Sequence, residues 1–145
     1  MEIYTIGFTG TSAESFFTRL NEAAVERLLD VRLNNTSQLA GFAKAKDLPF
    51  FTRHLVGAEY EHEPLLAPTQ ELLDAYKKRK GAWEDYESAF VDLMRSREIE
   101  QRMNHEDFER ATVLLCSEPT AERCHRRLVA EYLARSWSDV EIVHL

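Results

Sequence analysis

The stretch from Ala111 to Cys116, ATVLLC, restricts the fold more than any other, because nearly all of its residues are apolar. A strand of this composition is buried on both faces, which is typical of parallel sheets that carry helices on either side. Ile3 to Gly7 and Val140 to Leu145 are further stretches rich in β-branched or apolar residues that also predict strands. The sequence therefore predicts a largely parallel β-sheet with flanking helices.

The N-terminal part of the chain predicts a strand, a helix and a second strand in succession. A capping box follows the first strand, with Thr11 as the N-cap and Glu14 three residues later. Apolar residues then recur at helical spacing as far as Ala24, and residues Arg27 to Leu33 form the second predicted strand. Such strand–helix–strand units are nearly always right-handed, and their strands are parallel.

The rest of the chain continues this alternation. A loop is predicted from Asn34 to Phe42, a helix from Leu48 to Val56, a strand from Ala58 to His62 and a loop from Pro64 to Pro68. Two helices follow: the first is capped by Thr69 and ended by Gly81, and the second carries the apolar stripe Trp83, Tyr86, Phe90, Leu93 and Met94. The segment from Arg95 to Arg110 is charged and predicted to be mostly solvated, and a last helix is predicted from Pro119 or Thr120 to about Arg135. We therefore predict one α/β domain over residues 1–145, Rossmann-like, with about four or five strands and a helical insert from Pro64 to Arg97. The apolar stripes of the insert must be buried against another surface. The insert could pack on the rest of the domain as a lid, or on a second copy of the chain in a homodimer.

Composition narrows the classes of partner and the cellular setting. A net charge of −7 and a pI near 5.3 argue against non-specific binding to nucleic acid or to an anionic membrane. The N-terminus MEIYTIGFTG lacks the features of a signal peptide, and no apolar run approaches the ~20 residues that span a bilayer. With cysteines only at Cys116 and Cys124, we expect a cytoplasmic protein with free thiols.

Polar residues follow several of the predicted strands. Asp30 and Arg32 lie late in the second strand with Asn34 and Asn35 after it, and the strand ending at Cys116 is followed by Ser117 and Glu118. In open α/β sheets ligands bind at the carboxyl ends of the strands. In the helix predicted from Pro119 or Thr120, His125 lies on the apolar side and faces the sheet near Cys116 or Asp30.

These residues favour an enzyme, or failing that a ligand-binding protein, that acts on a small anionic or nucleotide-like molecule at this edge. The predicted catalytic residues are Asp30, Cys116, Glu118 and His125, and the predicted ligand-binding residues are Arg32, Asn34, Asn35 and Arg126. Sulfur transfer by Cys116 is disfavoured, because CSEPTAERC has no glycine cradle and Glu118 opposes a thiolate. The sequence assigns no cofactor and no reaction type.

Two other function classes stay open at this point. Cys116, Glu118, Cys124 and His125 are ligand types that zinc accepts, but adjacent Cys124 and His125 would project about 100° apart on a helix. A nucleic-acid-binding module could use a basic face made of Arg53, Lys77, Lys78, Arg79, Lys80, Arg126 and Arg127. The acidity of the chain weighs against the second alternative.

Several of the candidate residues also have a purely structural interpretation. Cys116 could be a small core residue, His125 a core histidine with one partner, and Asp30 with Arg32 a structural ion pair. Arg126 and Arg127 are expected at the surface, and the Trp83–Phe90 stripe is expected in the core. Convergence of several candidates on one edge of the sheet favours a functional site over these alternatives.

Several separated motifs resemble the DUF488 family, a domain of unknown function. They are YTIG at Tyr4–Gly7, DVR at Asp30–Arg32, CSE at Cys116–Glu118 and CHR at Cys124–Arg126, in the stretches LLDVRLNNTSQLAGF and CSEPTAERCHRRLVAEYL. The segment from Leu33 to Phe42 is similar to one bacterial branch of the family, whereas Glu63 after His62 departs from the more apolar residue expected there. The resemblance implies an α/β domain over the whole chain and a site at these motifs, but no particular reaction.

Overall fold

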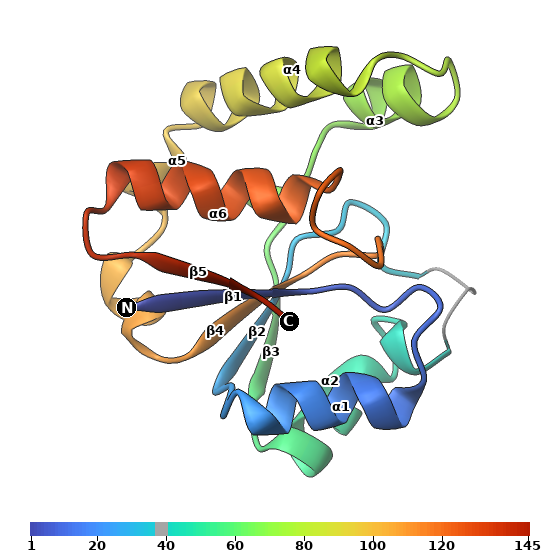
Figure 1. Cartoon of the computed structure of the whole chain (residues 1–145), viewed down its shortest axis with the longest axis vertical. Helices are drawn as coiled ribbons and strands as arrows, with labels where there is room; N and C mark the ends of the chain where they lie inside the picture. The colour runs from blue at the N-terminus through green and yellow to red at the C-terminus, as the bar shows by residue number, and fades with distance from the viewer. Residues whose placement is uncertain (37–40) are drawn as a thin grey trace.

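A parallel β-sheet forms the centre of the protein, with helices on both of its faces (Figure 1). The computed structural model describes residues 1–36 and 41–145, and over these residues the sheet has five strands in the order β3-β2-β4-β1-β5. All four pairings between neighbouring strands are parallel. The strands are β1 (Glu2–Ile6), β2 (Arg27–Asp30), β3 (Glu59–His62), β4 (Thr112–Leu115) and β5 (Glu141–His144). The predicted fold class is confirmed.

The position of each strand in the sheet follows from its composition. β4 lies in the middle and all of its residues are buried, as its continuous apolar sequence predicts. The edge strand β3 instead alternates exposed and partly buried residues, with Glu59 and Glu61 exposed. Charged residues on an edge strand discourage pairing with other chains.

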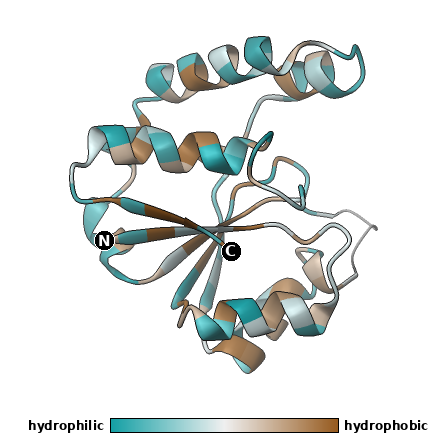
Figure 2. Cartoon of the chain, viewed as in Figure 1, coloured by the Kyte–Doolittle hydropathy of each residue, from teal (hydrophilic) through white to brown (hydrophobic). Residues whose placement is uncertain are grey.

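The helices form two layers, one on each face of the sheet (Figure 1). One layer contains α1 (Ala13–Glu22), α2 (Leu48–Phe51), the π-helix η2 (Thr52–Val56) and the short η1 (Gly41–Ala43). In the other, α6 (His125–Ser136) lies nearer the sheet, and α3 (Gln70–Lys77) and α4 (Trp83–Ser96) lie outside it (Figure 1). This side also contains α5 (Ile99–Arg102), and the 3-10 turns η3 (Pro64–Leu66) and η4 (His105–Glu109) complete the chain. Figure 2 shows hydrophobic and hydrophilic residues mixed along the helices, as expected when one side is buried.

The helical insert is largely covered by the domain itself. α4 packs against α6, and its stripe residues Trp83, Tyr86, Phe90 and Met94 are buried in the same hydrophobic cluster as the buried side of α6. Within residues 1–36 and 41–145, no helix combines the length and the apolar composition that crossing a membrane requires.

Several details of the predicted elements were wrong. The N-cap of α1 is Ser12 rather than Thr11, because the Ser12 hydroxyl accepts the Ser15 backbone N–H at 3.1 Å. β2 ends at Asp30, and residues 37–40 of the loop predicted after it lie outside the described residues. The segment from Arg95 to Arg110 is less solvated than predicted, since α5 and η4 within it bury Ile99, Met103 and Phe108.

The start of α6 is the correction that matters most for the site. α6 begins at His125, not at Pro119 or Thr120. The intervening residues form a loop because Ser117 O accepts the backbone N–H of Thr9 at 3.1 Å and Glu118 O accepts Nη1 of Arg126 at 2.6 Å. Cys124 is therefore the N-cap, in extended backbone at φ −137° and ψ 138°.

Candidate functional site

A pocket lies at the carboxyl end of β4, where the chain connections leave the sheet in opposite directions. β1 leads to α1 in one layer, whereas its neighbour β4 leads to α6 in the other (Figure 1). Such a divergence opens a crevice beside the strand ends. The cavity has a volume of about 250 Å³ and is lined by Arg32, Leu33, Asn34, Pro68, Leu73, Tyr76, Lys77, Trp83, Tyr86, Cys116, Ser117, Glu118, Arg123, Cys124 and His125.

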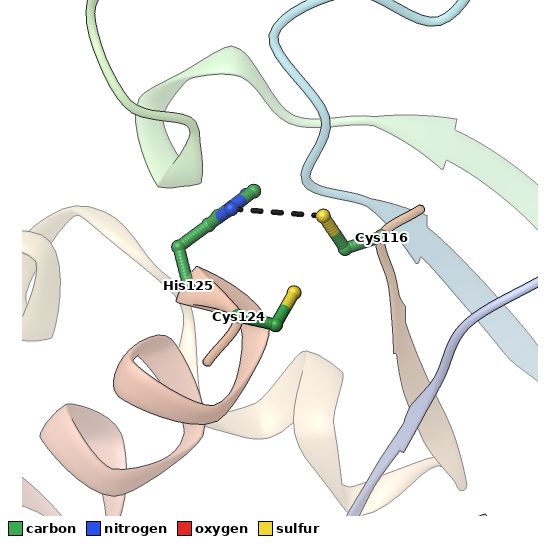
Figure 3. A group of neighbouring side chains, drawn as sticks. All are labelled: Cys116, Cys124 and His125. Atoms are coloured by element: carbon green, nitrogen blue, oxygen red, sulfur yellow. Dashed lines mark hydrogen bonds between the residues drawn. The ribbon is translucent and has the colours of Figure 1, made fainter. Parts of the chain in front are cut away.

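Cys116 and His125 meet in this pocket as the sequence predicted. Cys116 follows β4, His125 opens α6, and the Cys116 Sγ lies 3.6 Å from Nδ1 of His125 (Figure 3). The other ring nitrogen, Nε2, lies 2.7 Å from the carbonyl oxygen of Val31. A carbonyl can only accept, so Nε2 carries the proton, and in the neutral ring Nδ1 is left to accept from the thiol or to bind a cation.

Cys124 completes a buried group of three. The ligand atoms of Cys116, Cys124 and His125 lie within 4.8 Å of one another, and Figure 3 shows the three side chains converging from the end of β4 and the start of α6. Among the described residues this is the one cluster of histidine, cysteine and carboxylate groups that is close enough to share a metal ion. We refer to these residues below as the thiol–imidazole trio.

The two thiols of the trio differ in acidity. A hydrogen bond from Cys124, assisted by the backbone N–H groups of Ser117 and Glu118 and by the charge of Arg126, holds the pKa of the Cys116 thiol below its usual range despite burial. Burial raises the pKa of Cys124 well above its usual range, and the neighbouring Cys116 adds to the rise. Of the two thiols, Cys116 is therefore the one that loses its proton first as pH rises.

Arg126 supports the loop that carries the trio. The sequence predicted this arginine at the surface, but it is buried. It is 1% exposed, and its Nη1 donates to Glu118 O at 2.6 Å and to Cys124 Sγ at 3.5 Å. Gly7 makes this approach of chain segments feasible, because a Cβ at this position would lie 1.7 Å from Glu118 O. The YTIG motif thus supplies the space that the loop after Cys116 occupies.

Asp30 is not brought to the pocket with Cys116. Its fully buried carboxylate forms a bidentate ion pair with Arg32, with 2.8 Å from Nε to Oδ1 and from Nη2 to Oδ2, and accepts the Tyr60 hydroxyl at 2.6 Å. The Arg32 guanidinium stacks over Phe8 and also donates to Ala43 O at 2.7 Å. Asp30 does not line the pocket, and its contacts are those of the buried ion pair that the sequence left open as an alternative.

The remaining predicted residues, catalytic Glu118 and ligand-binding Asn34 and Asn35, divide between the pocket and this ion pair. Asn34 and Glu118 line the pocket, and the Glu118 carboxylate forms a half-exposed ion pair with Lys77 at 2.7 Å. Asn35 lies beside the ion pair instead, with Nδ2 3.4 Å from the Tyr60 hydroxyl. His62 also lies there, since its Nε2 is 2.8 Å from Arg32 O.

Sequence reasoning missed the wall of the pocket that the helical insert supplies. Tyr76, Trp83 and Tyr86 pack as a cluster with ring centroids 5.0–5.5 Å apart, and all three line the cavity. Trp83 and Tyr86 are buried, as the stripe predicts, but the sequence pattern does not reveal that these core residues also face a cavity. A second, more open groove adjoins the pocket. Lys77 and Arg123 line both the pocket and the groove, and we call this shared region the mouth; Lys80 lines the groove as well.

The basic residues considered for nucleic acid do not gather on one face. Arg126 is buried, Arg127 pairs with Glu87 at 3.0 Å, and Lys78 lies 3.7 Å from Asp74. Arg53 belongs to η2 in the opposite helix layer.

Comparisons with known proteins identify a family but no characterised relative. Searches of curated proteins and of solved structures return no match. A family model described as "Domain of unknown function DUF488" matches residues 12–133, which include the DVR, CSE and CHR motifs but not Tyr4–Gly7. The match spans most of the chain, and the protein therefore belongs to the DUF488 family.

Proposed function

We propose that the protein is an enzyme that binds a small, flat, anionic molecule of nucleotide-like shape and acts on it at the thiol–imidazole trio. One observation carries the proposal: the 250 Å³ pocket joins an aromatic wall, a cationic mouth and the thiol–imidazole trio. A concave apolar site with a few convergent polar groups is the usual form of a small-molecule site.

The aromatic wall favours a ring system as part of the ligand. Tyr76, Trp83 and Tyr86 line the cavity as a cluster of rings, and the buried trio lines it too. Stacking of a nucleobase on an aromatic side chain contributes about 1–3 kcal/mol. A planar ring would therefore gain affinity from this wall while its edge reaches Cys116 and His125.

The mouth favours a negative charge on the ligand. Lys77 and Arg123 line both the pocket and the groove beyond it, and Lys80 extends this cationic surface. Arg32 is buried against Asp30, and Arg126 is buried with its Nη1 on the backbone oxygen of Glu118. Arg123 is exposed, and the ion pair of Lys77 with Glu118 is half-exposed, so these two cations are better placed to bind a phosphate or carboxylate. The anionic ligand predicted from the sequence is retained here, with different cations as its partners.

The proposal is tested by thermal unfolding with adenosine 5′-monophosphate, adenosine and inorganic phosphate. We expect adenosine 5′-monophosphate to raise Tm more than either fragment does, because it alone engages both wall and mouth. Arg123→Met should abolish most of that rise, whereas Arg135→Met, an exposed arginine of α6 away from the pocket, should keep it. Equal shifts in both variants would contradict the proposal, as would a rise in Tm with adenosine 5′-monophosphate that is no larger than the rise with adenosine or with phosphate.

A further inference from the structure

We infer that Cys116, Cys124 and His125 bind one zinc ion, whose fourth coordination position is open to the pocket. This inference deepens the proposed function. It rests on that function only for the identity of the ligand that the open fourth position faces. It restores a site that sequence reasoning disfavoured, and it leaves Glu118 out of the ligand set because that carboxylate pairs with Lys77.

The spacing of the ligand atoms fits a tetrahedral zinc ion. Zn–S bonds of about 2.3 Å and Zn–N bonds of about 2.0–2.1 Å give a sulfur-to-nitrogen edge of ~3.6 Å in a tetrahedron. The Cys116 Sγ lies 3.6 Å from His125 Nδ1, and all three ligand atoms lie within 4.8 Å of one another. Small side-chain rotations would therefore suffice to close the three ligands around one ion.

The local backbone removes the objection that adjacent Cys124 and His125 cannot both bind. That objection assumed a helix through both residues, but Cys124 is the N-cap in extended backbone and only His125 is helical. Their side chains thus leave two different backbone conformations and converge on Cys116 (Figure 3).

The surroundings of the trio also match those of a metal site. His125 donates Nε2–H to Val31 O, and an outer hydrogen bond of this kind orients most zinc-binding histidines. Arg126 donates to Cys124 Sγ at 3.5 Å, which offsets charge on a second thiolate. Two thiolates, a neutral imidazole and Zn²⁺ carry no net charge, so burial of the complete site is acceptable.

Three protein ligands leave one position for a ligand atom or a water molecule, which is the pattern of catalytic rather than structural zinc sites. All three residues line the pocket, so the open position faces the space where the proposed ligand binds. A zinc ion there would polarise an oxygen or nitrogen atom of that ligand. Cys116 would then act as a ligand of the metal and not as a nucleophile.

The test begins with untagged protein purified without chelator, in which we expect one zinc ion per chain by elemental analysis. Cys124→Ser and His125→Gln should lose the zinc, whereas the control His62→Gln, which alters a histidine outside the trio, should retain it. Replacement by Co²⁺ in the wild-type chain should give thiolate-to-cobalt charge-transfer absorption and the intense visible bands of a four-coordinate site, a result that does not depend on whether a variant folds.

Wild-type protein that fails to retain zinc or cobalt after loading and dialysis would overturn the inference, as would equal zinc content in Cys124→Ser and wild type. Binding of adenosine 5′-monophosphate, measured in parallel, separates the two proposals. Zinc without nucleotide binding contradicts only the proposed ligand. Nucleotide binding without zinc, combined with rapid alkylation of Cys116, overturns the zinc site and indicates a thiol nucleophile.

Discussion

Asp30 and Cys116 stand at the ends of neighbouring parallel strands, yet their side chains lie on opposite faces of the sheet. Asp30 is in register with Leu115, so Cys116 is level with Val31, and alternation along the strand separates the two side chains. Val31 and Cys116 belong to the hydrophobic cluster under α4 and α6, whereas Arg32, the partner of Asp30, stacks on Phe8 in the cluster under α1. Sharing an edge of the sheet is therefore not sufficient for sharing a site.

Asp30→Asn should destabilise the fold without a direct effect on the pocket. The substitution leaves the buried Arg32 guanidinium without its counter-ion, which costs about 3–5 kcal/mol. Tyr60→Phe removes one hydrogen bond to the same carboxylate and should cost about 1 kcal/mol. Urea denaturation measures both losses. An Asp30→Asn variant with wild-type stability but weaker binding of adenosine 5′-monophosphate would return Asp30 to the functional site.

Gly7→Ala should displace the loop after Cys116. The new Cβ would lie 1.7 Å from Glu118 O and 2.9 Å from Nη1 of Arg126, so the backbone must move, at a cost of about 1–3 kcal/mol or more. Because this loop positions Cys116 and Cys124, we also expect weaker zinc binding in competition with a chromogenic chelator.

Gly41→Ala is the matched control for that substitution. No described atom lies within 4 Å of a Cβ built at Gly41, so the change in the free energy of unfolding should stay within about 0.5 kcal/mol. If both variants lose a similar amount of unfolding free energy, the close approach of Glu118 to Gly7 does not explain the need for glycine at this position.

Lys77→Met should weaken ligand binding much more than it weakens the fold. The side chains of Lys77 and Glu118, which form an ion pair, are 49% and 39% exposed. Loss of such an exposed pair should change the free energy of unfolding by only about 0–1 kcal/mol. Affinity for adenosine 5′-monophosphate should fall several-fold in calorimetry, and the variant's affinity should depend less on salt. Lys78→Met, whose lysine does not line the pocket, should bind like wild type.

In chelator-treated protein, Cys116 should react with iodoacetamide at lower pH than Cys124. The pKa of Cys116 is lowered by its hydrogen bond from Cys124 and that of Cys124 is raised by burial, so thiolate forms first on Cys116 as pH rises. Trypsin cleaves between Arg123 and Cys124, and mass spectrometry can follow the two thiols on separate peptides. Zinc should suppress alkylation of both, and faster labelling of Cys124 would contradict the assigned acidities.

The local sequence determined the elements and the sheet type. The apolar run ATVLLC predicted the central strand β4, and alternation of strands with amphipathic helices predicted a parallel sheet, because both patterns reflect burial along the chain itself. The sequence also predicted that His125 lies on the inward side of the next helix, near Cys116 or Asp30, and of these two the structure brings it to Cys116.

Only the tertiary structure decided which neighbours each polar residue has. The start of α6 at His125 depends on bonds from Thr9 and Arg126 to the loop after Cys116, which no local pattern encodes. The aromatic wall forms because the helical insert packs beside the end of β4, although the insert and β4 are far apart in the sequence. Burial can be inferred from periodicity within one element, but contacts between elements depend on how the layers pack, and these contacts placed Asp30 with Arg32 and Cys124 with the trio.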